Sequence, residues 1–384
     1  MSGRIPRVGV VHPWLPQYRL EFFELVAKRA PDWGFELVVL HGAPPPELAA
    51  RRDSVSSSTF IEVPDRFSLG GRGAIWKDGR VIREHGPWDA LVLEQAVRNI
   101  ESYRWLAQRK VPVAFWGHGR TYTKEVPRAQ EWLKRVLTRR TRWFFAYTDG
   151  GRKHVESMGF DPSRITVVNN TIDVARLRSL LRSVQEADRQ ELRSEIDASG
   201  PVLTFIGGLD DSKRIDFLMD TTRELARVVP EATVVVAGAG PRQTDVRSLA
   251  EALPNLRYSP PVFGFQKAVL LSSSDYILMP GRVGLVVMDS FASGTPIITT
   301  RWPLHAPEFE YLRPGVDSIV TRDDVGAYVE AVRDAVRAPT TVRTSMRDAA
   351  LDSSQRFSIE DMGSRFLDGI REFLVQEGKL GGSP

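Results

Sequence analysis

The chain alternates short runs of β-branched and other apolar residues with longer amphipathic stretches, and it does so in two separate series. In the first series, the strand-like runs occupy residues 5–12, 35–40, 88–94, 111–116 and 165–169. In the second series, they occupy residues 202–206, 233–237, 276–279 and 296–300. Strands that alternate with helices pack into parallel sheets with helices on both faces. The alternation therefore predicts an α/β protein with two doubly wound, Rossmann-like domains.

The length of the chain and the position of one charged segment predict where the domains begin and end. At 384 residues the chain exceeds what one hydrophobic core usually holds, so two domains are expected. Residues 176–200 are charged, helical in pattern and poor in strand formers, and they are predicted to be a linker. This linker would separate a first domain of residues 1–175 from a second domain of residues 201–358. An amphipathic helix at residues 359–384 follows, and its return to the first domain is one interpretation.

The composition excludes several classes of protein. Hydrophobic residues make up 42% and charged residues 26% of the chain, and no apolar run approaches the ~18 residues that a membrane-spanning helix requires. The chain contains no cysteine, which excludes disulfides, zinc bound by cysteine and thiol catalysis. No cluster of metal ligands is visible in the sequence. The N-terminus enters a strand without an apolar leader, so a cytoplasmic protein is expected.

Polar residues follow three of the strand-like runs in the first domain. His12 and Glu94 end two of these runs, and the turn Gly117-His118-Gly119 follows a third. The carboxyl ends of parallel strands meet at one edge of a sheet, where the ligands of such sheets bind. We therefore predict that these residues lie together at a ligand-binding edge. For His118, a structural role within a glycine-rich turn is the alternative.

Two glycine-bearing loops in the second domain have the features of a phosphate site. Residues 207–214 begin with two glycines at the end of a strand and finish on Lys213 and Arg214. Residues 280–284, Pro-Gly-Arg-Val-Gly, lead into a helix that is predicted to start near Leu285. Glycines let backbone amides approach a ligand, and a helix start favours an anion. Together the loops are expected to hold a diphosphate, and ordinary connections between strands and helices are the alternative.

A third glycine pair argues against a nicotinamide cofactor. Gly238 and Gly240 end another strand, but Gln243 stands where the dinucleotide fingerprint GxGxxG needs its third glycine. No matching acidic residue follows at a useful distance, and the fingerprint requires one for the ribose. An enzyme that uses a nicotinamide cofactor is therefore rejected.

The positive charge of the chain is concentrated in one segment. Residues 98–142 contain 12 basic and 3 acidic residues, whereas the whole chain has a net charge of +4. This asymmetry favours a polyanionic partner at one face, or else a solvated helix surface. Residues 128–145 are predicted to form one helix, with an apolar stripe that packs on the sheet and basic residues at 128–142 around it. Contact of this helix with an anionic membrane surface is the alternative, and no nucleic acid is expected because no nucleic-acid-binding module accompanies the charge.

Four ordered segments resemble motifs of the retaining glycosyltransferases of family 4, which have the GT-B fold of two facing Rossmann-like domains. FIGGLDDSKR is similar to FVGRLxxxKG, and VVVAGAGP is similar to VVVGDGP. PGRVGLVVMDSFASGTPIITT is similar to EGFGLxxxEAMAxGxPVVAT, and HAPEFEYLRPGVDSIV to GGxPEIVxxGxNGLLV. The first-domain segments PQYRLEFFELVAKRA and GFDPSRITVVNNTID also fit. The resemblance covers nearly the whole chain, and PGxVGL in place of the usual EGFGL marks a subgroup.

The resemblance implies roles for residues in both domains. It implies that a nucleotide-sugar donor is bound by Gly207, Gly208, Lys213, Arg214, Gly240, Gly281, Arg282, Val283, Gly284, Leu285 and Asp289. It implies a catalytic role for His118, which matches a histidine of the family that contacts the sugar or the acceptor. His12, Arg19 and Glu94 are the acceptor-side candidates. Glu308 aligns with the PE of the family and lies below the donor or pairs with an arginine, and no metal or other cofactor is implied.

Three positions depart from the family pattern. Gly208 stands where the family commonly has an arginine, and Arg214 or Arg282 is a candidate to replace that charge. The family has two glutamates eight positions apart, and Gly281 and Asp289 align with them. The contact with the donor sugar is the interaction that these departures affect.

The leading hypothesis is a cytoplasmic glycosyltransferase of polysaccharide or glycoconjugate biosynthesis, and a peripheral location at the inner membrane face is one interpretation. It would move a sugar from a nucleoside-diphosphate donor to a glycan or lipid-linked acceptor and retain the anomeric configuration. One alternative is a non-catalytic GT-B-like module that binds a nucleotide or a glycan, because Gly208 and Gly281 remove side chains of the family site. A sugar-nucleotide epimerase on the same fold is a further alternative.

Overall fold

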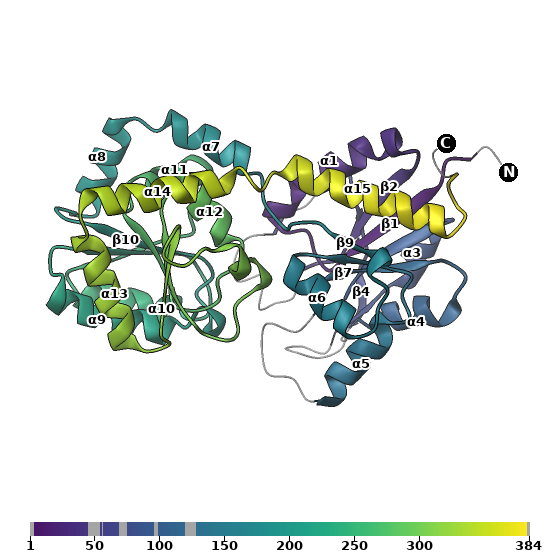
Figure 1. Cartoon of the computed structure of the whole chain (residues 1–384), viewed down its shortest axis with the longest axis horizontal. Coiled ribbons are helices and arrows are strands. Elements are labelled where there is room, and N and C mark those ends of the chain that lie inside the picture. The colour runs from purple at the N-terminus through teal and green to yellow at the C-terminus, as the bar shows by residue number, and fades with distance from the viewer. Residues whose placement is uncertain are drawn as a thin grey trace. The chain divides into compact units, whose positions relative to one another are not determined.

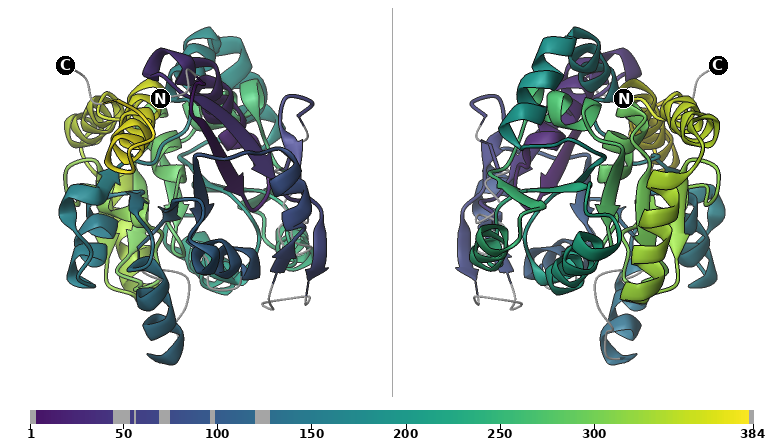
Figure 2. Two further views of the ribbon diagram at one scale, coloured as in Figure 1. Left: turned by 90° about the vertical axis from the view of Figure 1, so that its right-hand side faces the viewer. Right: turned by 90° about the vertical axis from the view of Figure 1, so that its left-hand side faces the viewer.

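The computed structural model of the protein divides into two compact units (Figure 1). It describes residues 4–44, 54–55, 57–68, 75–95, 99–119 and 128–381. The first unit comprises the described residues up to Asn170 together with those from Ile359 onward, and the second comprises Thr171–Ser358. Each unit contains a parallel β-sheet covered by helices (Figure 2), so the predicted α/β class is confirmed.

The first unit is built on a seven-stranded parallel sheet with the strand order β3-β2-β1-β6-β7-β8-β9. Its strands are β1 (Arg7–His12), β2 (Glu36–His41), β3 (Ile61–Glu62), β6 (Ala90–Glu94), β7 (Val113–Gly117), β8 (Trp143–Ala146) and β9 (Ile165–Val167). Two further strands, β4 (Asp65–Ser68) and β5 (Ile75–Lys77), form a separate antiparallel pair. Because β1, β6 and β7 are neighbours and parallel, the residues that follow them lie at one edge of the sheet, as predicted.

Helices cover both faces of the first sheet. They are α1 (Gln17–Arg29), α3 (Gly79–Glu84), α4 (Ile100–Gln108), α5 (Arg128–Thr138), α6 (Asp149–Ser157) and α15 (Ile359–Gln376), with 3-10 turns η1 (Ala30–Trp33) and η2 (Pro162–Arg164). The residues of β8 contribute to both faces. Trp143 and Phe145 belong to the core beside α1 and α15, whereas Phe144 and Ala146 belong to the core beside α4 and α6.

The segment 128–145 corrects the prediction of a single helix. Helix α5 ends at Thr138, and Trp143 already belongs to strand β8. In the turn between them, the Thr141 hydroxyl donates to the Thr138 carbonyl at 2.7 Å. A strand that is buried on both faces has apolar residues without alternation, and its pattern therefore resembles the end of a buried helix.

The C-terminal helix α15 packs on the first sheet. The ring centroid of Phe366, on this helix, lies 4.8 Å from that of Phe145 and 4.9 Å from that of Trp116. Gly369 lies against β8 and β9, because a Cβ at this position would come within 2.7 Å of Phe145 and 2.3 Å of the Thr166 hydroxyl. The last helix of the chain is therefore part of the core of the first unit.

The second unit is built on a six-stranded parallel sheet with the order β12-β11-β10-β13-β14-β15. Its strands are β10 (Val202–Ile206), β11 (Thr233–Ala237), β12 (Leu256–Ser259), β13 (Tyr276–Met279), β14 (Ile297–Thr300) and β15 (Ser318–Thr321). The two edge strands β12 and β15 were not predicted, because they are short and only half-buried in their middle residues. The strand order reverses between β10 and β13, which makes this pair the topological switch point of the sheet.

The helices of the second unit include the segment that the sequence predicted to be a linker. They are α7 (Val174–Ser183), α8 (Glu186–Glu195), α9 (Ile215–Val228), α10 (Gln243–Ala252), α11 (Gly264–Ser272), α12 (Val286–Ser293), α13 (Val325–Arg337) and α14 (Thr340–Ser354), with η3 (Asp211–Lys213) and η4 (Pro307–Tyr311). Helix α7 packs on α11 and α12, and its residues Val174 and Leu177 are buried in the core. Residues 176–200 thus belong to the second unit. Their charged residues cover its outer side, which produced the linker-like composition.

Candidate functional site

The two loops at the switch point of the second sheet are joined to each other. One follows β10 and contains Ser212 and Lys213, and the other follows β13 and contains Arg282. The Lys213 ammonium donates to the Arg282 carbonyl at 2.6 Å, and the Arg282 amide donates to the Ser212 carbonyl at 2.9 Å. The predicted proximity of these loops is therefore observed. These two hydrogen bonds connect the loops immediately before α12 begins.

Gly281 has no space for a side chain. A Cβ at this position would lie 2.3 Å from the carbonyl carbon and 2.5 Å from the carbonyl oxygen of Lys213. Contacts this short with a backbone require the loops to move apart. The glycine that replaces the glutamate of the family motif is therefore required by the close approach of the two loops.

The loop after β11 packs on the loop after β10. Gly240 has a φ of +155°, and a Cβ there would lie 2.4 Å from the Leu209 carbonyl oxygen. The Leu209 amide donates to the Ala239 carbonyl at 2.9 Å, and the Arg242 amide donates to the Leu209 carbonyl at 2.9 Å. Gly207, with a φ of +154°, and the half-buried Gly208 precede this contact. Gly240 thus supports the loop that leads to Lys213.

His305 accepts a hydrogen bond from the Val283 amide, which was predicted to bind the donor. The Val283 amide donates to His305 Nδ1 at 3.1 Å, and His305 Nε2 lies 2.8 Å from the Thr300 carbonyl. The His305 ring stacks on Phe309 with 4.0 Å between centroids. Since Nδ1 accepts, the ring is neutral and carries its proton on Nε2. Burial lowers the pKa of His305 to about 4, and the bond to the Thr300 carbonyl opposes this shift only in part.

The contact with His305 corrects the expectation that Val283 offers its amide to the diphosphate. Gly284 and Leu285, which lie at the start of α12, are the neighbouring positions of the same loop. Sequence reasoning did not assign a role to His305. The available signal was its place in the segment HAPEFEY, two residues before the Pro307-Glu308 pair of the family motif.

The two arginines of these loops have partners within the second unit. Arg214 pairs with Asp323 and lies 4.4 Å from the Phe217 ring centroid. Arg282 donates from Nε to the Leu304 carbonyl at 3.4 Å. The charge of Arg214 is therefore partly balanced by a carboxylate. The replacement of the family arginine, absent at position 208, by Arg214 or Arg282 remains a prediction.

Asp289 and Glu308 are two buried acids near these loops. Asp289, on α12, is 8% exposed, and its Oδ1 accepts a hydrogen bond of 2.7 Å from Lys267 on α11. Asp289 is therefore a buried, paired carboxylate and not an exposed one on the helix surface. Glu308 is 3% exposed, and its Oε2 lies 3.8 Å from where a Cβ of Gly284 would be. Glu308 therefore lies directly behind the start of α12.

In the first unit, the predicted edge residues differ in their surroundings. His12 is buried, its Nδ1 lies 2.5 Å from the Trp14 carbonyl, and its ring contacts Phe23 and Trp116. Burial lowers the pKa of His12 to about 3. Glu94 is half-buried at the end of β6. His12 thus has the environment of a packed core side chain, whereas Glu94 lies at the sheet edge.

His118 lies in a turn that is held by its neighbours. Its ring meets the ring of Tyr147 edge to face at 4.5 Å between centroids, and the residue is half-buried. Gly119 has a φ of +76°, which favours glycine, and a Cβ there would lie 2.7 Å from the Gly151 carbonyl oxygen. The turn therefore presents His118 in one backbone conformation at the edge of the sheet.

Arg19 lies inside the first unit rather than at its surface. Its guanidinium donates to the amide oxygen of Asn170 and to the sulfur of Met362 on α15, the latter at 3.7 Å. It also lies over the Trp116 ring, at 5.3 Å from the centroid. This acceptor-side candidate thus connects α1 to Asn170 and to α15. Its contact with an acceptor remains a prediction.

The basic segment is less uniformly exposed than the sequence indicated. Lys134 is 7% exposed, and burial lowers its pKa to about 8 against the attraction of Glu131 and Glu94. Trp132 is 65% exposed, whereas Trp143 is buried in β8. The tryptophan of this segment that is available to a partner is therefore Trp132, together with the exposed Arg135, Arg139, Arg140 and Arg142. Residues 98 and 120–127 lie outside the described part of the chain.

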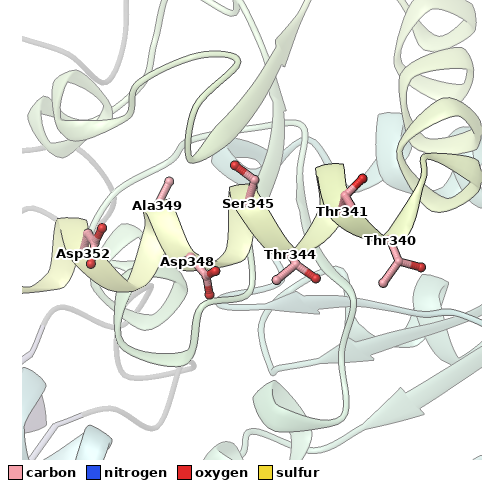
Figure 3. Close-up of a pocket in the computed structure, with 7 residues that line it drawn as sticks. All are labelled: Thr340, Thr341, Thr344, Ser345, Asp348, Ala349 and Asp352. Carbon is pink, nitrogen blue, oxygen red and sulfur yellow. The ribbon is translucent and has the colours of Figure 1, made fainter.

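A surface pocket of about 580 Å³ lies along α14 (Figure 3). It is lined by Thr340, Thr341, Thr344, Ser345, Asp348, Ala349 and Asp352. None of these residues belongs to the loops that follow the strands of the second sheet. The candidate site is therefore the switch-point loops and not this pocket. Among the described residues, no group of three or more acidic or histidine side chains is arranged to hold a metal ion, and no helix is long and apolar enough to cross a membrane.

Two glycosyltransferase family models match the chain, one in each unit. The model of glycosyltransferase family 4 matches residues 21–176, and the model of the glycosyl transferases group 1 matches residues 200–338. These matches include the edge with His118 and the switch-point loops with Lys213 and Gly281. The chain is a glycosyltransferase family 4-like protein. The subgroup defined by PGxVGL remains a prediction.

A curated relative of this family 4-like protein is D-inositol 3-phosphate glycosyltransferase 2 of Catenulispora acidiphila. The two are 27% identical over 245 residues, which are 58% of this chain and 56% of the relative. The chain thus spans about half the length of the curated relatives that it matches.

Solved structures show which fold the family 4-like protein has. HepE of Anabaena, solved in complex with UDP and glucose, has a TM-score of 0.68 at 13% identity, over 95% of this chain and 99% of that one. WaaG, a glycosyltransferase involved in lipopolysaccharide biosynthesis, has a TM-score of 0.65 at 14% identity, over 94% and 98%. The fold is therefore that of the GT-B glycosyltransferases, as the sequence predicted.

Proposed function

We propose that this family 4-like protein is an enzyme that moves a sugar from a nucleoside-diphosphate donor to a glycan or lipid-linked acceptor and retains the anomeric configuration. The observation that carries the proposal is the joined pair of loops at the switch point, where the Lys213 ammonium is held on the Arg282 carbonyl just before α12 begins. A cation, glycine turns and a helix start in one place are the features of a diphosphate site. The corresponding residues are Gly207, Gly208, Lys213, Gly240, Gly281, Arg282, Gly284 and Leu285.

The proposed chemistry depends on the leaving group. Negative charge grows on the diphosphate as the bond to the sugar breaks, so groups that stabilise this charge in the transition state raise the rate. Lys213 supplies a positive charge. The Val287 and Met288 amides already donate to the Gly284 and Leu285 carbonyls, so the backbone N–H groups proposed for the diphosphate are those of Gly284 and Leu285. No metal is needed for this role. Because Gly281 cannot carry a side chain, we do not assign a carboxylate to the sugar from this position.

The donor is proposed to be a sugar nucleotide. HepE was solved with UDP and with UDP-glucose, and its GT-B fold supports a nucleoside diphosphate in the same fold here. Asp289 is the candidate for the ribose hydroxyls, because Lys267 holds one of its carboxylate oxygens in place. The base and the sugar are left unassigned.

The acceptor is proposed to be anionic. The curated relative is named for an inositol phosphate, and the exposed arginines after Trp132 supply positive charge in the first unit. His118, at the edge of the first sheet, is the candidate for contact with the sugar or the acceptor, with Glu94 near it at the same edge. We further propose a cytoplasmic protein whose α5 touches an anionic membrane surface.

The membrane contact is testable by co-sedimentation with vesicles. Wild-type protein is expected to bind vesicles of phosphatidylcholine with about 30% phosphatidylserine, because each basic residue near an anionic surface contributes about 1 kcal/mol of binding free energy. Trp132→Ala and Arg139→Gln are expected to weaken this binding, and vesicles of phosphatidylcholine alone are the control. Equal binding to both vesicles would remove the electrostatic part of the proposal.

The experiment that tests the function is a thermal-shift panel of nucleoside diphosphates and their sugars, followed by a transfer and hydrolysis assay with each ligand that binds. A ligand at 100 times its Kd stabilises the folded protein by about 2.7 kcal/mol, which such a panel detects. Lys213→Ala is expected to weaken diphosphate binding sharply, and Arg227→Ala is the matched control because Arg227 is a 75%-exposed cation of the same unit. Unchanged affinity in Lys213→Ala would refute the proposed site.

Turnover separates an enzyme from a binding module. His118→Ala is expected to lower turnover while nucleoside-diphosphate binding stays intact. Binding without transfer or donor hydrolysis in the wild type would instead favour the non-catalytic module, for which the internal use of the Val283 amide and the absence of a side chain at Gly281 are the supporting observations.

A further inference from the structure

We propose that Gln95 is a positioning residue that fixes the turn carrying His118. The inference rests on the proposed function, since it concerns how His118 is presented for transfer. Gln95 directly follows β6, at the same edge of the sheet as the turn that follows β7. Nothing in the sequence pattern singled it out.

The side chain of Gln95 connects the turn to α5 through both ends of its amide. Its Oε1 accepts a hydrogen bond of 3.1 Å from the Gly119 amide, which belongs to the residue after His118. Its Nε2 donates to the Thr138 hydroxyl at 2.8 Å. The Gly119 N–H requires an acceptor, so the amide oxygen must face the turn and the amide nitrogen must face α5. Gln95 therefore has one orientation.

The residue before His118 is also shaped by Gln95. A Cβ on Gly117 would lie 2.7 Å from the Cβ of Gln95 and 3.1 Å from its Oε1. The backbone N–H of Gln95 donates to the Trp116 carbonyl at 3.0 Å, and this bond continues the pairing of β6 with β7. Gln95 thus touches the backbone on both sides of His118, and its side chain fills the space that the glycine leaves.

The other end of this connection is rigid. Thr138 is 0% exposed and is the last residue of α5, where the Thr141 hydroxyl donates to its carbonyl at 2.7 Å. The turn itself is held on its far side by Gly151, whose backbone oxygen lies against Gly119, and by the ring of Tyr147. Removal of the Gln95 amide would therefore release the described hydrogen bonds that tie this turn to α5. A displacement of about 1 Å at a reacting group is enough to cost on the order of 100-fold in rate.

The test compares kcat and KM of variants of the whole 384-residue chain, with a donor and an acceptor that the wild type uses. Gln95→Leu removes both hydrogen bonds at similar volume, and it is expected to lower kcat about 10- to 100-fold with the donor KM changed less than about 3-fold. Gln95→Glu keeps an acceptor for Gly119 and can accept from the Thr138 hydroxyl, so it is expected to retain more activity than Gln95→Leu. Gln108→Leu makes the same substitution at an exposed glutamine of the first unit and is expected to match the wild type.

A double-mutant cycle with His118 distinguishes positioning from general destabilisation. If Gln95 acts through His118, Gln95→Leu in the His118→Ala background is expected to change kcat less than 2-fold. A further 10-fold loss in that background, or full activity of Gln95→Leu alone, would overturn the inference. A wild type that shows neither transfer nor hydrolysis overturns the proposed function instead, and the role of Gln95 is then decided by hydrogen exchange of the Gly119 amide. Gln95→Leu is expected to speed that exchange at least 10-fold, and unchanged exchange would reject the contact.

Discussion

The backbone of Lys213 occupies the space in which a side chain on Gly281 would lie. A Cβ on Gly281 would be 2.3 Å from the Lys213 carbonyl carbon, although the two residues are far apart in the chain. The Lys213 ammonium then reaches the Arg282 carbonyl at 2.6 Å. One close approach thus sets the identity of residue 281 and the position of the proposed diphosphate cation.

A larger side chain at residue 281 is therefore expected to separate the loops. Gly281→Ala is expected to destabilise the second unit by about 1–3 kcal/mol, the usual cost of excess volume in a packed region. Gly281→Glu is expected to lower nucleoside-diphosphate affinity, even though it restores the acid of the family motif. Urea unfolding and calorimetric titration measure the two effects. Gly284→Ala is the folding control, because its Cβ would have only ordinary contacts of 3.5 Å or more, and a tighter-binding Gly281→Glu would contradict the argument.

The stability of the second unit is expected to fall below pH 6.5 because of His305. Its pKa is about 4 in the folded protein against 6.5 when unfolded, so between these values only the unfolded chain binds the proton. The contribution of His305 to the free energy of unfolding is thus fully present above pH 6.5. As the pH is lowered from 6.5 to about 4, this contribution decreases by up to about 1.4 kcal/mol per pH unit. His305→Gln, which keeps a polar side chain but does not titrate, is expected to show a shallower slope. Amide hydrogen exchange in β10 and β13 at pH 7 and pH 5 checks this, and equal slopes would exclude His305 as the cause.

Asp289 is expected to distinguish nucleosides from bare phosphates. If its carboxylate binds ribose hydroxyls, Asp289→Asn lowers affinity for nucleoside diphosphates about 10- to 100-fold, since a hydrogen bond to a charged group contributes about 1.5–3 kcal/mol. Pyrophosphate has no ribose, so its affinity is expected to stay the same. Calorimetric titration of both ligands measures the difference. Equal weakening of both would show that Asp289 acts on the loops through Lys267, its 2.7 Å partner, and not on the ribose.

The last helix is expected to be essential for the first unit. Phe366 is 0% exposed and lies between Trp116, Phe145 and Phe22, so Phe366→Ala is expected to cost about 3–5 kcal/mol. Unfolding of the first unit is followed by the fluorescence of its buried tryptophans. Glu372→Ala, at an exposed position of the same helix, is the control and is expected to stay within about 0.5 kcal/mol. A small loss in Phe366→Ala would mean that α15 is a peripheral addition.

The alternation of strands and helices along the chain, and the edge of each sheet at which the candidate residues lie, were predictable from local patterns. Period-two and period-3.6 runs identify strands and helices, and the carboxyl ends of neighbouring parallel strands must share an edge. This is why the loops with Lys213 and Gly281 were expected to be neighbours. The same reasoning failed for residues 128–145, because a strand buried on both faces has no alternation to reveal it.

The exposure of individual charged residues was not predictable. Lys134 lies on a helix that is amphipathic by pattern, yet it is buried, and Asp289 is buried and paired with Lys267 on another helix. A helical pattern gives the face on which a residue lies relative to its own axis. What covers that face depends on elements that are distant in the chain.

The sequence by itself determined the two doubly wound units, because they follow from periodicity. It also determined the GT-B resemblance, which rests on four ordered motifs, and the pairing of the two glycine-bearing loops, which follow strands of the same domain. Only the tertiary structure decided that His305 takes the Val283 amide, that Gln95 holds the turn of His118 and that residue 281 must be glycine. Each of these depends on a distance of a few ångströms between segments that are remote in the sequence. No local pattern records such a distance, and it exists only once the chain is packed.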